Sequence, residues 1–207
     1  MSARLVLATR NAHKVVELRE ILADLAGDGG QHLDSAIVSI AEVSDAPDVV
    51  ESGVTFAENS LLKARAACLA TGLPALADDS GLAVDVLGGS PGVFSARWSG
   101  GGDDAANVRL LLAQLGDVPD EHRGAGFICA AALVTPAGEE HVELGHLRGV
   151  LERTPRGRGG FGYDPVLRVD ASRTLAQLSA AEKNAISHRG QALRALAPRV
   201  IALLTEA

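Results

Sequence analysis

The sequence PALADDSG at residues 74–81 places two adjacent carboxylates, Asp78 and Asp79, directly after an apolar run. Mg²⁺ is usually held by one or two carboxylates together with substrate phosphates, and a further carboxylate can then accept a proton from water. An Asp-Asp-Ser-Gly sequence is also an ordinary turn, because Asp and Ser bond to their own backbone and Gly tolerates positive φ. This stretch alone favours neither the phosphate site nor the turn.

The composition predicts one globular domain over residues 1–207. Hydrophobic residues make up 47% of the chain, enough for a core in one domain or in two lobes that share a sheet. A net charge of −7 and an aromatic content of 3% indicate no nucleic-acid surface. Cys68 and Cys129 lack metal-ligand or redox spacing, and no segment resembles a signal peptide or a membrane span. We therefore expect a cytoplasmic protein without nucleic-acid or membrane partners.

Short apolar runs alternate with helical periodicity along the chain, which predicts a mixed α/β fold. Two capping boxes, at Thr55 and Ser179, mark helix starts. We expect the helical region after Ser179 to reach Leu204, with interruptions at Gly190 and Pro198. The predicted strands cover residues 4–8, 37–40, 82–87, 127–134 and 141–147, the last two forming a hairpin, and helices are predicted at 11–25, 55–70 and 103–115, with a long loop at 88–102.

The first loop, TRNAHK at residues 9–14, lies between a predicted strand and a predicted helix. Free N–H groups and the helix dipole attract anions at such a position, and Thr9, Asn11 and Lys14 add further donors. The competing interpretation is an Asn11 N-cap beside a solvated Lys14. The loop lacks the glycines and the Gly-Lys-Ser/Thr ending of a Walker loop.

In the second predicted helix, Asn59 and Lys63 are four residues apart and share a face. That face could offer a cation to a phosphate group. An exposed lysine on a solvated face is the more common arrangement and remains open as an alternative.

The segment GRGGFG at residues 157–162 matches the G-x-G-x-x-G dinucleotide fingerprint only formally. The fingerprint requires a helix to open within it, whereas we expect residues 163–167 to turn back into an extended segment because Pro165 disfavours helix at Asp164. Phe161 could stack on a base or anchor a core under the glycine loop, and we weigh the two equally. Further along, Lys183, His188 and Arg189 bring cations and an imidazole to a predicted helix interruption, either as surface groups or as part of a ligand site.

Five segments together resemble the inosine triphosphate pyrophosphatase family, which hydrolyses non-standard purine nucleoside triphosphates to the monophosphate and pyrophosphate. They occur in the order typical of that family and span nearly the whole chain: LATRNAHKVVEL, ESGVTFAENSLLKARAA, PALADDSGLAVDVLGGSPGVFSARWSG, GGFGYDP and EKNAISHRGQAL. The resemblance implies a mixed α/β fold with a long curved central sheet and flanking helices. These would form two lobes around a substrate cleft, in a homodimer.

The resemblance also implies roles for individual residues. Asp79 would be the catalytic base and, with Glu51 and Asp78, a Mg²⁺ ligand. Residues implied to bind the nucleotide are Thr9, Arg10, Asn11, Ala12, His13, Lys14, Lys63, Ser80, Phe161, Gly162, Tyr163, Asp164, Lys183, His188 and Arg189. Three positions depart from the usual pattern of the family, namely Arg10, Trp98 and Gly126.

The implied substrates are ITP, dITP and XTP, whose bases carry a 6-oxo acceptor where adenine carries a 6-amino donor. Donors from His188 or Arg189 would be left unpaired against adenine, at a cost of about 1 to 3 kcal/mol. Two other hypotheses remain: a nucleotide sensor that uses the same residues without catalysis, and a related phosphatase that acts on another nucleotide.

Overall fold

The computed structural model describes residues 5–26 and 36–205, leaving out the side chains at positions 13, 25, 26 and 205. The chain divides into two compact units. Unit 1 comprises Met1–Asp79, Cys129–Gly145 and Arg189–Ala207, and unit 2 comprises Ser80–Ile128 and His146–His188. The arrangement as one domain around a cleft stays a prediction.

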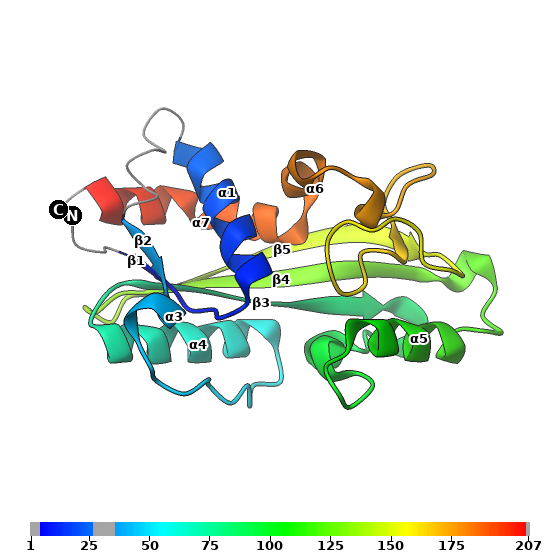
Figure 1. Cartoon of the computed structure of the whole chain (residues 1–207), viewed down its shortest axis with the longest axis horizontal. Helices are drawn as coiled ribbons and strands as arrows, with labels where there is room; N and C mark the ends of the chain where they lie inside the picture. The colour runs from blue at the N-terminus through cyan, green and yellow to red at the C-terminus, as the bar shows by residue number, and fades with distance from the viewer. Residues whose placement is uncertain (1–4, 27–35, 206–207) are drawn as a thin grey trace. The chain divides into compact units, whose positions relative to one another are not determined.

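The strands form one six-stranded sheet in the order β2-β1-β3-β4-β5-β6. Figure 1 labels β1 to β5. The strands are β1 Leu5–Leu7, β2 Ile37–Ser39, β3 Ala75–Val84, β4 Gly124–Val134, β5 Glu140–Leu151 and β6 Leu167–Arg168. Strand β1 pairs in parallel with β2 and β3, whereas β5 and β6 are antiparallel. The turn between β4 and β5 is closed by Gly138 N–H donating to Thr135 O at 2.9 Å, so the predicted hairpin is confirmed. The mixed α/β fold with flanking helices is likewise confirmed.

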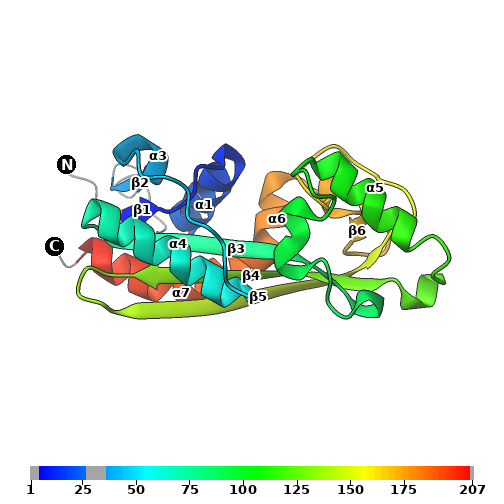
Figure 2. The same ribbon diagram turned by 90° about the horizontal axis from the view of Figure 1, so that it is seen from below.

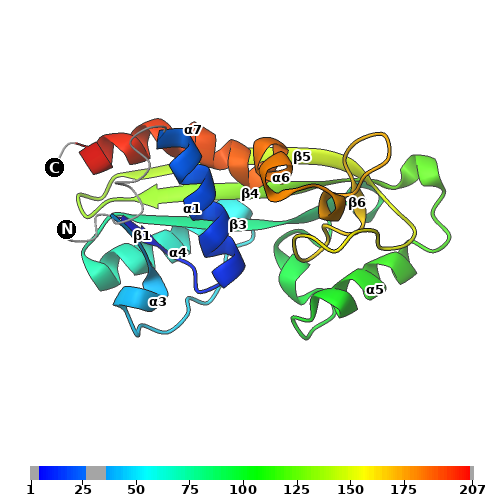
Figure 3. The same ribbon diagram turned by 45° about the horizontal axis from the view of Figure 1, so that its top comes forward.

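Unit 1 has helices on both faces of its part of the sheet. The helices are α1 Ala12–Ala26, α3 Ile40–Val43, α4 Phe56–Thr71 and α7 His188–Thr205. Figure 3 shows α1 crossing in front of β3 on the face that α7 also covers, and Figure 2 shows α4 along the opposite face. Each face therefore has its own apolar core.

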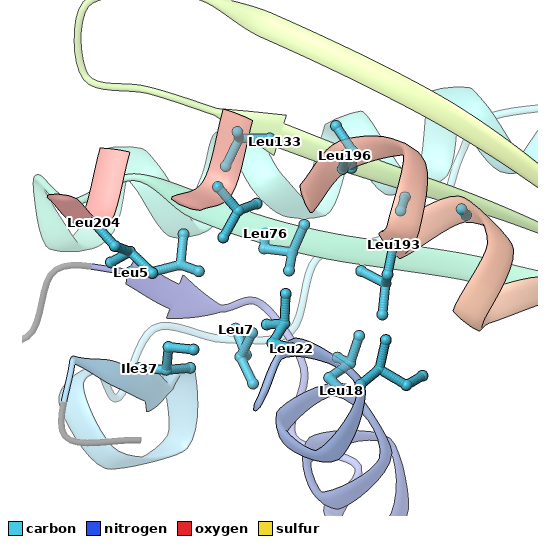
Figure 4. Packing of buried hydrophobic residues seen from close by; sticks show 14 of the residues in the cluster. Leu5, Leu7, Leu18, Leu22, Ile37, Leu76, Leu133, Leu193, Leu196 and Leu204 are labelled. Carbon is cyan, nitrogen blue, oxygen red and sulfur yellow. The ribbon is translucent and has the colours of Figure 1, made fainter. Parts of the chain in front are cut away.

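Alternation along β3 divides its side chains between these two cores. Leu76 joins the core formed with α1 and α7, where Leu18, Leu22 and Leu193 are buried (Figure 4). Ala75 and Ala77 join the core formed with α3 and α4. The next two residues of the strand are the two aspartates, so the same alternation decides where their carboxylates point.

The predicted helix boundaries are mostly confirmed, since α1 and α4 begin where the sequence indicates. Thr55 Oγ1 accepts from Glu58 N–H at 3.1 Å in the predicted capping box, and α4 ends at Gly72, whose φ of +69° suits glycine. The predicted interruptions at Gly190 and Pro198 are wrong. The break lies at Ser187, whose backbone is extended between α6 and α7, and α7 continues through Pro198. Packing of the α7 leucines on the sheet outweighs the single backbone bond that proline removes.

Unit 2 contains α5 Asp104–Gln114 and α6 Ala180–Ile186. Its core joins Leu82 and Val84 of β3 to Leu111 of α5 and to Tyr163. The predicted helix at 103–115 is confirmed, with Asp103 as its N-cap. The predicted loop at 88–102 contains the 3-10 helix η3 Gly92–Arg97, which the glycines on either side concealed.

Two further expectations need correction. Residues 77–81 lie inside the continuous strand β3, so the predicted strand start at residue 82 is wrong, and the structure excludes the alternative of an Asp-Asp-Ser-Gly turn. Residues 162–166 form turns rather than an extended segment, with Val166 N–H donating to Tyr163 O at 3.0 Å. No helix opens in the glycine-rich segment, which supports rejecting the dinucleotide fingerprint.

Candidate active site in unit 1 and aromatic cluster in unit 2

A cavity of about 410 Å³ opens in unit 1 where the first loop meets α4 and the chain before α4. Volumes of this order are typical of small-ligand sites. Its polar lining comes from Thr9, Arg10, Asn11, Lys14, Asp48, Glu51, Lys63 and Asp78. The first loop, the segment before α4, α4 itself and β3 therefore bring cations and carboxylates to one space.

Asp78 faces α1 and α7, where two cations bond its Oδ2. Lys14 Nζ donates to Asp78 Oδ2 at 2.9 Å, and Arg189 donates to the same oxygen through Nε at 3.1 Å and Nη2 at 3.0 Å. Burial alone would raise the pKa of Asp78, but the charges of Lys14 and Arg189 hold it well below its usual range. Asp78 is therefore a permanent anion, unsuited to take up a proton.

Arg189 is itself buried, and Glu17 of α1 supplies its second counter-charge. Arg189 Nη1 bonds to Glu17 Oε2, and both side chains are nearly inaccessible to solvent. The strong burial lowers the pKa of Arg189 less than the nearby carboxylates raise it, so this arginine stays charged. Three nitrogens of the predicted base-binding arginine thus hold carboxylates of unit 1.

Asp79 faces α4 and has a different environment. Lys63 Nζ donates to Asp79 Oδ1 at 3.0 Å and Asn59 Nδ2 donates to Asp79 Oδ2 at 3.2 Å. Burial raises the pKa of Asp79 above its usual 3.8, the charge of Lys63 lowers it and that of Glu51 raises it, with a net increase. A carboxylate with a raised pKa is a better proton acceptor than an ordinary aspartate.

Lys63 joins Asp79 to Glu51. Its Nζ donates to Glu51 Oε1 at 2.9 Å, and only 16% of its side chain is exposed. Burial would lower the pKa of Lys63, but the carboxylates around it, led by Asp79, raise it. The alternative of a solvated lysine is therefore wrong for Lys63, and the Asp78 contact excludes it for Lys14 as well.

The first loop is ordered by its own side chains. Thr9 Oγ1 accepts from Asn11 N–H at 3.2 Å, and Asn11 Oδ1 accepts from Lys14 N–H at 3.3 Å, so Asn11 is an N-cap of α1. Both residues also line the cavity. Ala12 opens α1 and is exposed, while the side chain of His13 lies outside the described residues.

The other predicted binding residues lie in unit 2. Asp164 Oδ2 accepts from Lys183 Nζ at 2.8 Å and from Phe161 N–H at 3.0 Å, and Lys183 Nζ lies 4.9 Å from the centre of the Phe161 ring. Phe161 is half-buried, so its ring is neither enclosed in the core nor fully exposed to solvent. This small cluster holds an aromatic face and a cation in fixed relation.

His188 stacks on Phe127, with ring centres 4.8 Å apart and planes inclined by 12°. Tyr163 belongs to the core of unit 2, where its hydroxyl donates to Ser95 O at 3.0 Å. Gly162 N–H donates to Asp104 Oδ2 at 2.8 Å, and Ser80 is half-buried in β3 directly after Asp79. The site roles of all these residues stay predictions.

The predicted metal ligands are Asp79, Glu51 and Asp78. In residues 5–26 and 36–205, no group of three or more His, Cys, Asp or Glu side chains is placed to hold a metal ion. Mg²⁺ needs only one or two protein carboxylates when substrate phosphates complete its shell, and Asp79 and Glu51 both reach the same ammonium group. Asp78 Oδ1 is buried with no hydrogen-bond partner among the described residues. The oxygen donors therefore fit a cation that arrives with its substrate.

A family model described as the Ham1 family matches residues 5–199 of the chain. The chain belongs to the Ham1 family.

Curated relatives span nearly its whole length. A Streptomyces avermitilis protein named dITP/XTP pyrophosphatase is 63% identical over 203 residues, covering 97% of this chain and 98% of that protein. A Mycobacterium tuberculosis protein of the same name is 54% identical over 204 residues, covering 98% and 97% respectively. These names confirm the resemblance to the inosine triphosphate pyrophosphatase family.

Solved Ham1 structures share the fold. A Ham1 protein from Staphylococcus aureus matches with a TM-score of 0.82 and 36% identity, covering 96% of this chain and 98% of that one. A HAM1 protein from Coxiella burnetii matches with a TM-score of 0.82 and 42% identity, covering 99% and 100%.

Two residues of this Ham1 chain belong to the site although no site role was predicted for them. Asn59 is fully buried, and besides donating to Asp79 its Oδ1 accepts a hydrogen bond from Gly53 N–H at 2.8 Å. Its position four residues before Lys63 was the available signal. Glu17 lies three residues after Lys14 on α1, but its partner Arg189 is 172 residues away, and no local pattern indicates that pairing.

Proposed function

We propose that this chain hydrolyses the non-standard purine nucleoside triphosphates ITP, dITP and XTP to the nucleoside monophosphate and pyrophosphate. The observation that carries the proposal is the full-length similarity to proteins named dITP/XTP pyrophosphatase, 63% identical over 203 residues. Lysines line the cavity of unit 1, and one of them, Lys63, bonds Asp79, the carboxylate with the raised pKa.

The residues of unit 1 have separate proposed roles in binding and hydrolysing the triphosphate. Lys14 and Lys63 line the cavity and would neutralise phosphate oxygens, assisted by Thr9 and Asn11. Asp79 would orient a water molecule and accept its proton for in-line attack that releases pyrophosphate. Asp78 would not act as a base, since its charge is held by Lys14 and Arg189. Its part is to keep those two cations in place.

We also propose that the reaction requires Mg²⁺, held by Asp79 and Glu51 with the buried Asp78 as a third anion. When bound, the ion would neutralise charge on the phosphate oxygens. Lys63 already bridges Asp79 and Glu51, which keeps both carboxylates at the site in the absence of the ion.

We assign binding of the purine base to the cluster of Phe161 and Lys183. This assignment is supported by the aromatic face of Phe161 beside the ammonium group of Lys183. Stacking on such a face is worth about 1 to 3 kcal/mol per base. His188 and Arg189 remain the proposed source of donors to the 6-oxo group. For Arg189 this would require a donor beyond the three that hold Asp78 and Glu51.

A cytoplasmic location and a homodimer belong to the same proposal. The buried Cys68 and Cys129 are free thiols, as in proteins of reducing compartments. Among the helices of the described ranges, none is long and apolar enough to cross a membrane.

A hydrolysis panel tests the proposed reaction. ITP, dITP, XTP, GTP and ATP are each incubated with the protein with and without Mg²⁺, and pyrophosphate is resolved from orthophosphate. Mg²⁺-dependent release of pyrophosphate from ITP, dITP and XTP, with little from ATP, is the expected result. Binding without turnover would indicate a sensor, and orthophosphate release would refute the assigned bond cleavage.

A further inference from the structure

Residues 44–52 join α3 to α4 and form one wall of the cavity in unit 1. We call them the 44–52 segment. They have no regular secondary structure, and Val50 is 80% exposed. The segment nevertheless supplies Ala46, Pro47, Asp48, Val49 and Glu51 to the cavity lining. Something other than core burial must therefore hold this wall in place.

The ends of the 44–52 segment are held by bonds to the neighbouring helices. Ser44 N–H donates to Ile40 O at 3.0 Å, and just beyond the other end Gly53 N–H donates to Asn59 Oδ1 at 2.8 Å. Between these points the backbone bonds are short-range, such as Ser52 N–H to Val50 O at 2.9 Å, and the Glu51 side chain bonds Lys63 of α4. They do not tie the wall to the sheet or to α1.

Arg10 provides that tie. Its Nη2 donates to Ser44 O at 3.0 Å and to Ala46 O at 2.6 Å, and its Nε donates to Asp48 Oδ1 at 3.0 Å. Within residues 5–26 and 36–205, Arg10 is the one residue outside the segment that forms hydrogen bonds to any of residues 45–50. One planar guanidinium thus connects the first loop to three points of the wall.

We propose that Arg10 is a positioning residue, which holds the 44–52 segment so that Glu51 stays at the ammonium group of Lys63. Its guanidinium bonds the wall rather than a phosphate, and its effect on catalysis passes through Glu51. Only the expected effect of Arg10 on the rate of nucleotide hydrolysis rests on the proposed function. The anchoring of the segment can be measured whatever the substrate is.

Limited proteolysis measures the anchoring. Glutamyl endopeptidase cuts after Glu51 only when the segment opens, so Arg10→Ala should be cut at that bond about tenfold faster than the wild type, the effect of losing bonds to a charged donor. Arg10→Lys should lie between the two. The control is Arg19→Ala, because Arg19 has similar exposure and also bonds a carbonyl and a carboxylate, Ile37 O and Glu42 Oε2, outside the segment. An unchanged cutting rate in Arg10→Ala would overturn the proposal.

Steady-state kinetics test whether Arg10 affects catalysis through Glu51. Arg10→Ala should lower kcat for dITP by about ten- to hundredfold, the range for groups that orient a metal ligand. In Glu51→Ala the further change Arg10→Ala should have almost no effect, because the positioned group is already absent. Additive losses, or a change confined to KM, would instead show a direct contact with substrate and overturn the positioning role. If the wild type turns over no dITP while the cutting rates change as expected, the proposed function fails and the anchoring role stands.

Discussion

Asp78 and Asp79 are consecutive residues of β3, yet their carboxylates bond on opposite faces of the sheet. Asp78 bonds Lys14 of α1 and Arg189 of α7, while Asp79 bonds Asn59 and Lys63 of α4. Strand alternation causes the separation, and the partners on each face set opposite pKa shifts. Adjacent carboxylates whose pKa values move apart divide the roles of structural anion and proton acceptor.

Replacing each aspartate by asparagine should separate these roles. Asp79→Asn should lower turnover of dITP by about 10² to 10⁴, the usual contribution of a general base, and leave the free energy of unfolding close to that of the wild type. Asp78→Asn should cost about 3 to 5 kcal/mol of stability, because Lys14 and Arg189 lose a buried counter-charge. Urea unfolding and steady-state rates check both. A near-normal rate in Asp79→Asn would remove this residue from the base role.

Acid should destabilise the protein partly through Asp78. The pKa of this carboxyl is lowered in the folded state by Lys14 and Arg189 against its burial, so its stabilisation is complete above the ordinary value of 3.8 and is lost as pH falls below it. Unfolding free energies of the wild type should therefore decline more steeply below this pH than those of Asp78→Asn. Parallel curves for the two proteins would contradict the assignment.

The charges around Asp79 should move its pKa in opposite directions. Glu51 raises the pKa of Asp79 and Lys63 lowers it, so Glu51→Gln should shift it down and Lys63→Gln should shift it up. Carboxyl ¹³C NMR of the metal-free protein can follow this titration. Arg65→Gln is a suitable control, because Arg65 also lies on α4 but pairs with Glu140 outside the cavity. A shift of the same sign in both test variants would refute the assigned electrostatics.

Phe161→Leu tests the proposed stacking face. Loss of the aromatic ring should weaken IMP binding about 5- to 150-fold, the equivalent of 1 to 3 kcal/mol. Phe94→Leu is the matched control, because Phe94 is also partly exposed and lies 5.3 Å from the Arg97 guanidinium, yet it has no predicted contact with the base. Isothermal titration calorimetry gives both affinities. Equal effects of the two substitutions would place the base elsewhere.

Arg189 should matter for both stability and selectivity. Arg189→Ala should destabilise the protein by about 3 to 5 kcal/mol, since Asp78 and Glu17 lose a shared buried cation. Arg189→Lys keeps the charge but loses the planar fork, which makes it the better variant for substrate preference. We expect the ratio of kcat/KM for ITP over ATP to fall in Arg189→Lys. An unchanged ratio would locate base recognition in other residues.

The sequence by itself determined the local elements of unit 1 and the residue types of the site. The capping box predicted the start of α4, and the leucine periodicity predicted α1. Each signal depends only on residues that are close together in the sequence. Five ordered motifs indicated the family. What stayed open was whether the Asp-Asp-Ser-Gly stretch is a turn and whether the lysines are solvated.

Only the tertiary structure decided those questions. Residues 77–81 remain extended because β3 is paired within the sheet. Asp78 bonds Lys14 and Arg189, which are 64 and 111 residues away in the sequence. The break at Ser187, rather than at Gly190 or Pro198, likewise follows from packing of α7 on the sheet. Such contacts depend on which surfaces meet when the chain folds. Local propensity carries no information about a counter-charge a hundred residues away in the sequence. The different partners and opposite pKa shifts of Asp78 and Asp79 therefore arise only in the folded protein.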